Sequence, residues 1–166
     1  RFAERWGVGG SAEILIRGFR SGYAGAFSTL NEAWISQHFE LQASDRWLLE
    51  DPQASIIDQG GDILFGVDAV SEEVLGTVAL LRRDDDVIEL AYMSVASKAR
   101  GRQIGLKLGE TAITRSREMG AVVVCLLTSR ILNPAINLCT RLGFEEKPSA
   151  GEADDLRADV YMEVEL

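Results

Sequence analysis

Apolar residues recur along the chain in two periods, and each period predicts one kind of element. Compact or alternating apolar runs are typical of strands. They occur at 12–16, 62–69, 74–81, 87–95, 121–127 and 158–164, and a further strand is expected to begin at 144–146. Apolar residues three or four positions apart are typical of amphipathic helices. That spacing, read together with capping and helix-ending residues, predicts helices over 24–39, 46–50, 104–119 and 133–142.

The residues that separate these elements support the same boundaries. Ser44 is a candidate cap for the second helix, and Pro52 ends it. Gly120 follows the third helix, where a C-terminal glycine is favoured. Asn133 and Pro134 open the last helix, with the proline near its first position.

The order of elements predicts an α/β fold built on a mixed sheet. The three middle strands form a meander with short polar turns, so we expect them to be antiparallel. The helix at 104–119 joins two strands as a crossover, which favours parallel pairing of those two. The strand at 121–127 is almost wholly apolar and is expected to be buried on both faces. We expect one domain over 1–166, with a central mixed, mostly antiparallel sheet, helices on both faces, and 1–10 as a flexible or trimmed segment.

Composition and charge narrow the class of protein. Hydrophobic residues make up 46% and charged residues 26% of the 166 residues, as in ordinary globular domains. The net charge of −9 argues against nucleic acid or an anionic membrane as the main partner. It is compatible with a cationic substrate such as an amine, although solubility alone also explains it. No apolar run reaches the roughly 20 residues of a membrane helix, and 1–10 lacks the apolar core of a signal peptide. The chain does not begin with Met, so its true N-terminus stays open.

Cysteine and histidine usage argues against several kinds of site. Cys125 and Cys139 stand in apolar surroundings without a CxxC partner, so we expect buried free thiols in a reducing, cytoplasmic compartment. His38 is the only histidine of the sequence, which makes a His-based metal site or a Ser/His/Asp triad improbable. The acidic run at 84–86 is interpreted as a solvated turn, and we expect no metal cofactor.

The turn at 98–103 carries the strongest functional signal. An apolar strand precedes this basic, glycine-bearing turn, and a helix opens at about Ile104 with no acidic residue in its first turn. The N–H groups at a helix start have no intrahelical partner, and with the helix dipole they attract phosphate. Lys98, Arg100 and Arg102 add positive charge there. The segment is therefore predicted to hold a phosphorylated cofactor, the alternative being a merely solvated basic turn.

Two blocks of this sequence resemble the GCN5-related N-acetyltransferase (GNAT) superfamily. The run RGRQIG, from Arg100 to Gly105, resembles the family's pyrophosphate motif of Gln or Arg, two residues, Gly, one residue, and Gly or Ala. The run NPAINLC, from Asn133 to Cys139, leads into LGF at 142–144 and resembles a second block of the family. A glycine pattern alone is weak, but two blocks in the right order with the right elements between them are much stronger. The resemblance covers nearly the whole chain and implies the acyl-CoA N-acyltransferase fold.

The resemblance also implies acetyl-CoA as co-substrate, an amine as acceptor, and a set of binding residues. The pyrophosphate would be held by the backbone N–H groups of Arg100, Gly101, Arg102, Gln103, Ile104, Gly105 and Leu106. Val95 would bond the pantetheine arm through its main chain, beside a bulge that splays this strand from the next one and opens a slot for the cofactor. The N–H groups of Met93, Ser94 and Val95 are candidate oxyanion donors, because a bulge leaves one N–H unpaired. Asn133 would hydrogen-bond further along the cofactor.

Two residues depart from the family's pattern. Gln103 stands where the motif prefers its first glycine. A side chain there crowds the phosphate and disfavours positive φ, a penalty that is small if φ is negative. We expect the site to survive, because the remaining donors and both arginines are present. Cys139 stands where many members carry a tyrosine general acid that reprotonates the leaving thiolate. Cys139, water, Tyr92 and Tyr161 are left as candidate proton donors.

Glu89 is the candidate general base. An ammonium group has no lone pair, so the reaction needs a group that takes the proton of the amine. Glu89 lies six residues before Val95, where the family's histone-acetylating members carry a general-base glutamate. A pantetheine arm laid back along the strand would cover much of the roughly 20 Å between them. The alternative is a strand carboxylate that faces solvent or pairs with a nearby arginine.

The remaining candidates have weaker signals. His38 is interpreted as a helix-end or surface residue rather than a substrate contact. Trp34, Phe39 and Trp47 cluster around the first two helices, the region that covers the acceptor pocket in this fold. Packing is the default role for each of these aromatic residues.

Two functions from different classes fit the sequence. The first is an acetyl-CoA-dependent N-acetyltransferase that uses direct attack by an amine in a ternary complex. The second is a non-catalytic acyl-CoA binding or sensor domain, which the departures at Gln103 and Cys139 motivate. A P-loop is disfavoured, because no Gly-Lys-Ser/Thr follows the glycine turn. The acceptor stays open among a small molecule, a peptide and a protein N-terminus or lysine, as does the oligomeric state, a homodimer included.

Overall fold

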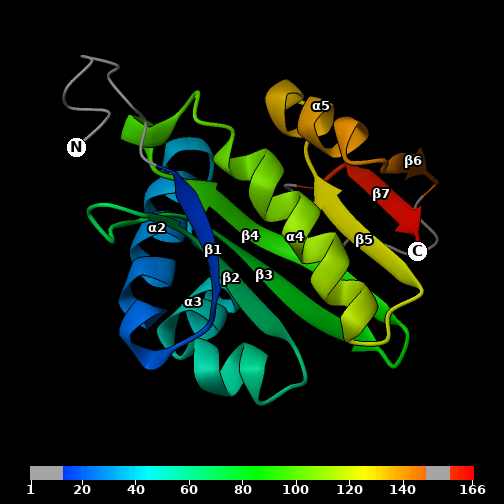
Figure 1. The fold of residues 1–166 in the computed structure, drawn as a ribbon. Coiled ribbons are helices and arrows are strands. Elements are labelled where there is room, and N and C mark those ends of the chain that lie inside the picture. Colours follow the sequence, from blue (N-terminus) through cyan, green and yellow to red (C-terminus); the bar gives the residue numbers. More distant parts are fainter. Residues whose placement is uncertain (1–12, 149–157) are drawn as a thin grey trace.

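The computed structural model describes residues 13–148 and 158–166, which form a seven-stranded sheet with helices on both faces (Figure 1). The strands are β1 (Ile14–Gly18), β2 (Asp62–Asp68), β3 (Val74–Asp84), β4 (Val87–Val95), β5 (Val123–Thr128), β6 (Glu145–Lys147) and β7 (Val160–Glu165). The helices are α2 (Ala24–His38), α3 (Ala43–Glu50), α4 (Ile104–Glu118) and α5 (Asn133–Arg141). Short turns of 3-10 helix, η1 (Ser21–Tyr23) and η3 (Ser97–Ala99), and of π-helix, η2 (Gln53–Ile57), connect them.

The strand order is β1-β2-β3-β4-β5-β7-β6. Neighbouring strands are antiparallel except β4 and β5, which are parallel and joined by the crossover helix α4. The predicted mixed, mostly antiparallel sheet is therefore confirmed. No helix in the described segments is long and apolar enough to cross a membrane.

Two apolar clusters cover the two faces of the sheet. On one face Phe27 of α2 and Leu49 of α3 pack against the first strands. On the other face Leu108 of α4 packs against the centre of the sheet, and Figure 1 shows α4 crossing that face with α5 beside it. Successive side chains of a strand point to opposite faces, so along β3 Ala79 belongs to the first cluster and Leu80 to the second. The predicted helices on both faces are confirmed.

The start of α3 differs from the prediction. The helix begins at Ala43 and its N-cap is Gln42, so the expected cap at Ser44 is wrong. The Gln42 N–H donates to the Asp45 carboxylate at 2.8 Å, and the Gln42 side chain accepts the Asp45 N–H. This reciprocal capping box satisfies two N–H groups at the helix start, whereas Ser44 lies inside the helix, two positions after the N-cap.

The other boundaries shift by a few residues. Strand β3 continues to Asp84, so the charged hairpin is shorter than the predicted loop, although the acidic run at 84–86 is exposed as expected. The π-helical turn η2 was not predicted, because its sequence lacks a helical period. The segment 1–10, expected to be flexible or trimmed, lies outside the described residues.

Strand β4 contains the bulge that the resemblance implied. Between the pairs Ala79–Ala91 and Thr77–Ser94, β4 has one residue more than β3. Tyr92 lies in this bulge with φ +52°, a left-handed conformation. A bulge of this kind bends the strand and disrupts the ladder locally.

The bulge coincides with the end of pairing between β4 and β5. The parallel register covers Val87–Leu90 against Val123–Leu126 and ends there, although both strands continue. From Ala91 onward the edge of β4 that faces β5 has no ladder partner in β5. The two strands therefore part at the bulge, as the resemblance implied.

Candidate functional site

The start of α4 presents a set of backbone donors. Its first intrahelical bond runs from the Lys107 N–H to the Gln103 carbonyl at 3.1 Å. The N–H groups of residues 104–106 therefore have no acceptor inside the helix. No side chain among the described residues caps this end, and its first turn has no acidic residue. Together with the helix dipole, these donors form a site for an anion.

Three cations, Lys98, Arg100 and Arg102, lie beside this helix start. The first two differ in whether they are ion-paired. Lys98 is ion-paired with Glu73 and is held at the surface. Arg100 is exposed, and the described part of the chain offers its guanidinium no carboxylate. Arg100 is therefore the side chain of this turn best placed to reach a phosphate.

Arg102 is held by the sheet. Its guanidinium donates to the Asp68 carboxylate at 3.1 Å, and both side chains are less than one-fifth exposed. The backbone N–H groups of Ser71 and Val70 lower the pKa of Asp68 to about 2, with a smaller contribution from Arg102. This ion pair fastens the turn to the end of β2, so any phosphate contact of Arg102 would come chiefly from its backbone.

Gln103 adopts a left-handed conformation, with φ +61° and ψ +27°. From the sequence, the conformational penalty at Gln103 was expected to be small if its φ is negative. The φ is positive, so that condition is not met. A non-glycine residue in this region costs roughly 1–2 kcal/mol. The glycine that the motif prefers would carry no such cost.

Replacing Gln103 with glycine is expected to raise the free energy of unfolding by about 1 kcal/mol, because the left-handed strain disappears. Urea unfolding followed by circular dichroism measures the change. Gln103→Ala is the control, since alanine meets the same steric penalty as glutamine. An equal gain in both variants would mean that the backbone conformation is not the cause.

The open edge of β4 offers main-chain hydrogen-bonding groups next to the start of β5. The Ala96 N–H donates to the Leu75 carbonyl at 2.8 Å and so points toward β3. Main-chain groups of successive strand residues point to alternate sides. The N–H and C=O of Val95 therefore point the other way, toward the side where β5 no longer pairs.

A small cavity of about 40 Å³ lies at the end of β4. It is lined by Val95, Ala96, Ser97 and Arg100 together with Leu30, Ala33, Trp34 and Gln37 of α2. The structure therefore brings Val95 and Arg100, two residues predicted for the cofactor site, to the same hollow.

Helix α5 places the second sequence block beside the first. A Cβ on Gly105 would lie 3.1 Å from Cδ2 of Leu138, so the middle of α5 packs directly on the first turn of α4. Asn133 lies exposed at the start of α5. The proposed contact between Asn133 and a cofactor stays a prediction.

Glu89 lies at the point where β4 and β5 part. It pairs with Cys125 in the parallel register, one residue before that register ends at Leu90. Its carboxylate accepts a hydrogen bond from the Arg83 guanidinium at 2.9 Å, and its side chain is 15% exposed. The arginine partner that the sequence left as the alternative is therefore present, and a role as base stays a prediction.

Cys125 pairs with Glu89 across β4 and β5, and Tyr161 of β7 adjoins Cys125. Burial raises the pKa of the Cys125 thiol to about 11, and the charge of Glu89 adds to the shift. The Tyr161 hydroxyl donates to the Glu163 carboxylate at 3.0 Å. Burial, followed by this hydrogen bond, raises the pKa of Tyr161. Both groups keep their protons at neutral pH.

Cys139 lies on α5, partly buried against the core on the α4 face. Burial raises the pKa of its thiol to about 11. An ordinary thiolate has a pKa near 8.5, so proton transfer to it from Cys139 is uphill by more than about two pKa units. The other candidate, Tyr92, already donates its hydroxyl proton to Asp45 at 2.9 Å. The identity of the proton donor among Cys139, water, Tyr92 and Tyr161 stays a prediction.

The aromatic residues of α2 and α3 have separate roles. Trp34 is half-buried and packs against the rings of His38 and Phe39 at centroid distances of 5.2 and 6.4 Å. Trp47 is 61% exposed, so a packing role for it is wrong. It faces outward because Asp45, two positions earlier on the helix, points into the core.

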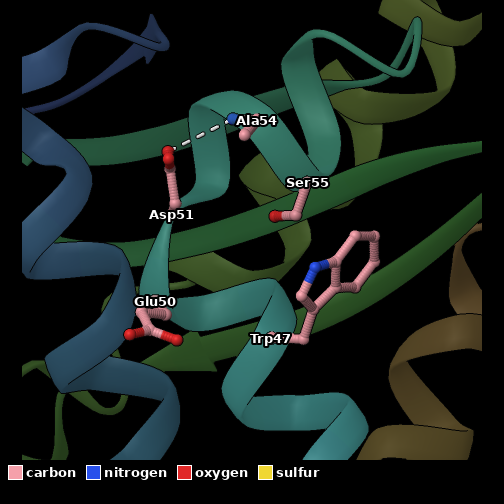
Figure 2. Close-up of a pocket in the computed structure, with 5 residues that line it drawn as sticks. All are labelled: Trp47, Glu50, Asp51, Ala54 and Ser55. Atoms are coloured by element: carbon pink, nitrogen blue, oxygen red, sulfur yellow. Dashed lines mark hydrogen bonds between the residues drawn. The ribbon is translucent and has the colours of Figure 1, made fainter.

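Trp47 lines a surface pocket of about 510 Å³ with Glu50, Asp51, Ala54 and Ser55 (Figure 2). The Asp51 carboxylate accepts the Ala54 N–H at 3.2 Å, which shapes one wall. In Figure 2 the indole lies on the opposite side of this hollow from Glu50 and Asp51. Among the described residues, no group of three or more His, Cys, Asp or Glu side chains is arranged to hold a metal.

The sequence did not reveal the role of Asp45. It is 1% exposed and binds both the start of α3 and the hydroxyl of Tyr92, 47 positions further along the chain. The spacing of Gln42 and Asp45 is that of a capping box and could have located the helix start. The contact to Tyr92 leaves no local signal.

A family model described as "Acetyltransferase (GNAT) family" matches residues 26–144. The "Probable N-acetyltransferase camello" of Xenopus laevis is 37% identical over 84 residues, which are 49% of this chain and 38% of that protein. The chain therefore matches less than half the length of that curated relative.

Solved structures share the fold. An acetyltransferase of the GNAT family from Staphylococcus aureus Mu50 has a TM-score of 0.80 at 18% identity, over 92% of this chain and 99% of that chain. YncA of Salmonella typhimurium, solved with its cofactor acetyl-CoA, has a TM-score of 0.70 at 21% identity, over 93% and 94% of the two chains.

Proposed function

The chain belongs to the acetyltransferase (GNAT) family, and we propose that it transfers an acetyl group from acetyl-CoA to a primary amine by direct attack in a ternary complex. The observation that carries the proposal is the alignment of two features. The first feature is the uncapped start of α4. The second is the open edge of β4, which runs from Val95 back to Ala91 and ends close to Glu89, where β4 is still paired with β5. An anion site at one end and a carboxylate at the other suit a long phosphorylated carrier of a reactive acyl group.

The residues of the site fit such a carrier. The pyrophosphate would be held by N–H groups at the start of α4 and by the guanidinium of Arg100. The main chain of Val95 would bond the pantetheine arm as a strand partner would. The thioester would then lie near the closed end of the gap, beside Glu89.

In the reaction, the amine nitrogen attacks the thioester carbonyl. A carbon–nitrogen bond forms, the carbon–sulfur bond breaks, and the sulfur leaves as a thiolate that is protonated from solvent, while the proton taken up by Glu89 returns to solvent. The amine proton passes to Glu89, directly or through one water. An N–H group that the bulge leaves unpaired between Met93 and Val95 would stabilise the charge on the carbonyl oxygen.

The acceptor is left at the level of an amine, since a fold does not fix a substrate. The net charge of −9 supports a cationic acceptor. We further propose a cytoplasmic location, because the buried Cys125 thiol and the partly buried Cys139 thiol suit a reducing compartment.

The proposal is tested by turnover. The protein is incubated with acetyl-CoA and a panel of small amines, peptides and lysine-bearing proteins, and release of free thiol is followed together with the mass of the acceptor. We expect thiol release that requires an acceptor and matches the acetylated product in amount. Calorimetric binding of CoA with no acetylated product from any acceptor would support a non-catalytic acyl-CoA sensor instead, a function that the strained Gln103 favours.

A further inference from the structure

The bulge of β4 contains a residue that needs outside support. Tyr92 has φ +52°, and a bulky side chain in this conformation is a genuine outlier. Such strain costs roughly 1–3 kcal/mol and persists only where surrounding contacts enforce it. Two sets of contacts from the helices of one face supply that support.

The first contact is with α3. The Tyr92 hydroxyl donates to one oxygen of the Asp45 carboxylate at 2.9 Å, while the other oxygen accepts the Gln42 N–H at 2.8 Å. Asp45 is only 1% exposed, and a buried carboxylate needs hydrogen-bond donors of this kind. One buried carboxylate therefore fixes the start of α3 and the bulge of β4 together.

The second set of contacts is with α2. The ring of Phe27 meets the ring of Tyr92 edge-on, with centroids 6.3 Å apart. Two residues after Tyr92, the Ser94 hydroxyl donates to the Leu30 carbonyl at 2.8 Å. The bulge is thus held on the α2–α3 side, whereas β5 no longer pairs with it.

We propose that Asp45 and Tyr92 form a positioning pair, which holds the bulge of β4 so that the main chain of Val95 faces the gap beside β5. The inference rests on the proposed function, since it assigns the pair to the alignment of the thioester. Tyr92 acts through the main chain that it holds and touches no reacting atom itself. If Tyr92 relaxes toward an ordinary strand conformation, the extra residue of β4 is accommodated elsewhere and the N–H groups at 93–95 turn.

The test is Tyr92→Phe, which keeps the ring and removes the hydroxyl. We expect kcat to fall about fivefold with the KM for the amine changed less than twofold, at a temperature where circular dichroism shows the variant fully folded. We also expect faster amide hydrogen exchange at 93–95, with exchange in the centre of α4 unchanged. Tyr23→Phe is the matched control, because Tyr23 packs in the same cluster but lies outside the bulge.

A second variant keeps the test decisive. Asp45→Asn removes the charge from the same pair. The double variant, Asp45→Asn with Tyr92→Phe, should lose no more kcat than the more impaired single variant, because both substitutions act through one contact. If Tyr92→Phe does not fold, Asp45→Asn alone must show the lower kcat and the faster exchange at 93–95. A merely structural role predicts a lower melting temperature with unchanged kcat per folded molecule, and that result would overturn the inference.

The failure of the inference can be told from failure of the proposed function. A wild-type protein that neither binds CoA nor releases thiol would refute the proposed function. A wild-type protein that turns over, with a Tyr92→Phe variant of equal kcat and equal exchange at 93–95, would refute only the positioning pair.

Discussion

Replacing Glu89 with glutamine is expected to lower kcat for acetyl transfer about a hundredfold, the lower range for loss of a general base. Glutamine has the same shape but cannot accept a proton at neutral pH. The carboxylate is paired with an arginine that is 53% exposed, and such a surface pair contributes at most about 1 kcal/mol, so the fold should remain intact. Steady-state kinetics and circular dichroism of the purified variant measure the two effects.

The pH dependence provides a second readout for Glu89. The pH profile of kcat/KM reports the essential acid and base groups of the free enzyme. If Glu89 is the base, that profile should change in Glu89→Gln. An unaltered profile with an unaltered kcat would remove Glu89 as the base.

Arg83→Gln is the matched control for this experiment. It breaks the same ion pair but leaves the carboxylate of Glu89 in place. If the pair serves structure alone, both variants lose the same stability and neither loses much activity. If Glu89 is the base, only the glutamate variant loses kcat.

The order of helices and strands was predictable, because the periodic spacing of apolar residues reflects which side chains are buried. Every strand of the sheet except the short, charged β6 has an apolar run or alternation, and α4 has its apolar stripe on the face that meets the sheet, so the order of the elements along the chain followed from the sequence. The cap of α3 was mispredicted, because several polar residues near a helix start compete and only the reciprocal contact of Gln42 and Asp45 decides between them.

The location of the candidate site was predictable from the sequence. Which of its cationic side chains is available to a ligand was not. A basic turn before an uncapped helix was evident from local sequence, but which cation remains available depends on residues far along the chain. Arg102 meets Asp68, 34 positions earlier, and Lys98 meets Glu73, 25 positions earlier. The left-handed conformations of Tyr92 and Gln103 were equally inaccessible, since neither residue type favours positive φ.

Lys98 and Arg102 are already ion-paired, whereas Arg100 is exposed, so Arg100 is the most informative charge to reverse. Arg100→Glu is expected to weaken CoA binding by more than about 1 kcal/mol, roughly a fivefold or greater rise in Kd, because it places a negative charge beside the phosphates and removes a charge-assisted hydrogen bond. Titration calorimetry with CoA at low and at high salt measures the loss, and added salt should narrow the difference between the variant and the wild-type protein.

The control for Arg100→Glu is Arg117→Glu. Arg117 is exposed in the last turn of the same helix, so the net charge changes equally while the new charge lies at the far end of α4. Arg117→Glu should bind CoA as the wild-type protein does, with a small loss of stability from the helix dipole. Equal affinity in all three proteins would contradict the placement of a pyrophosphate at the start of α4, and with it the acetyl-transfer proposal.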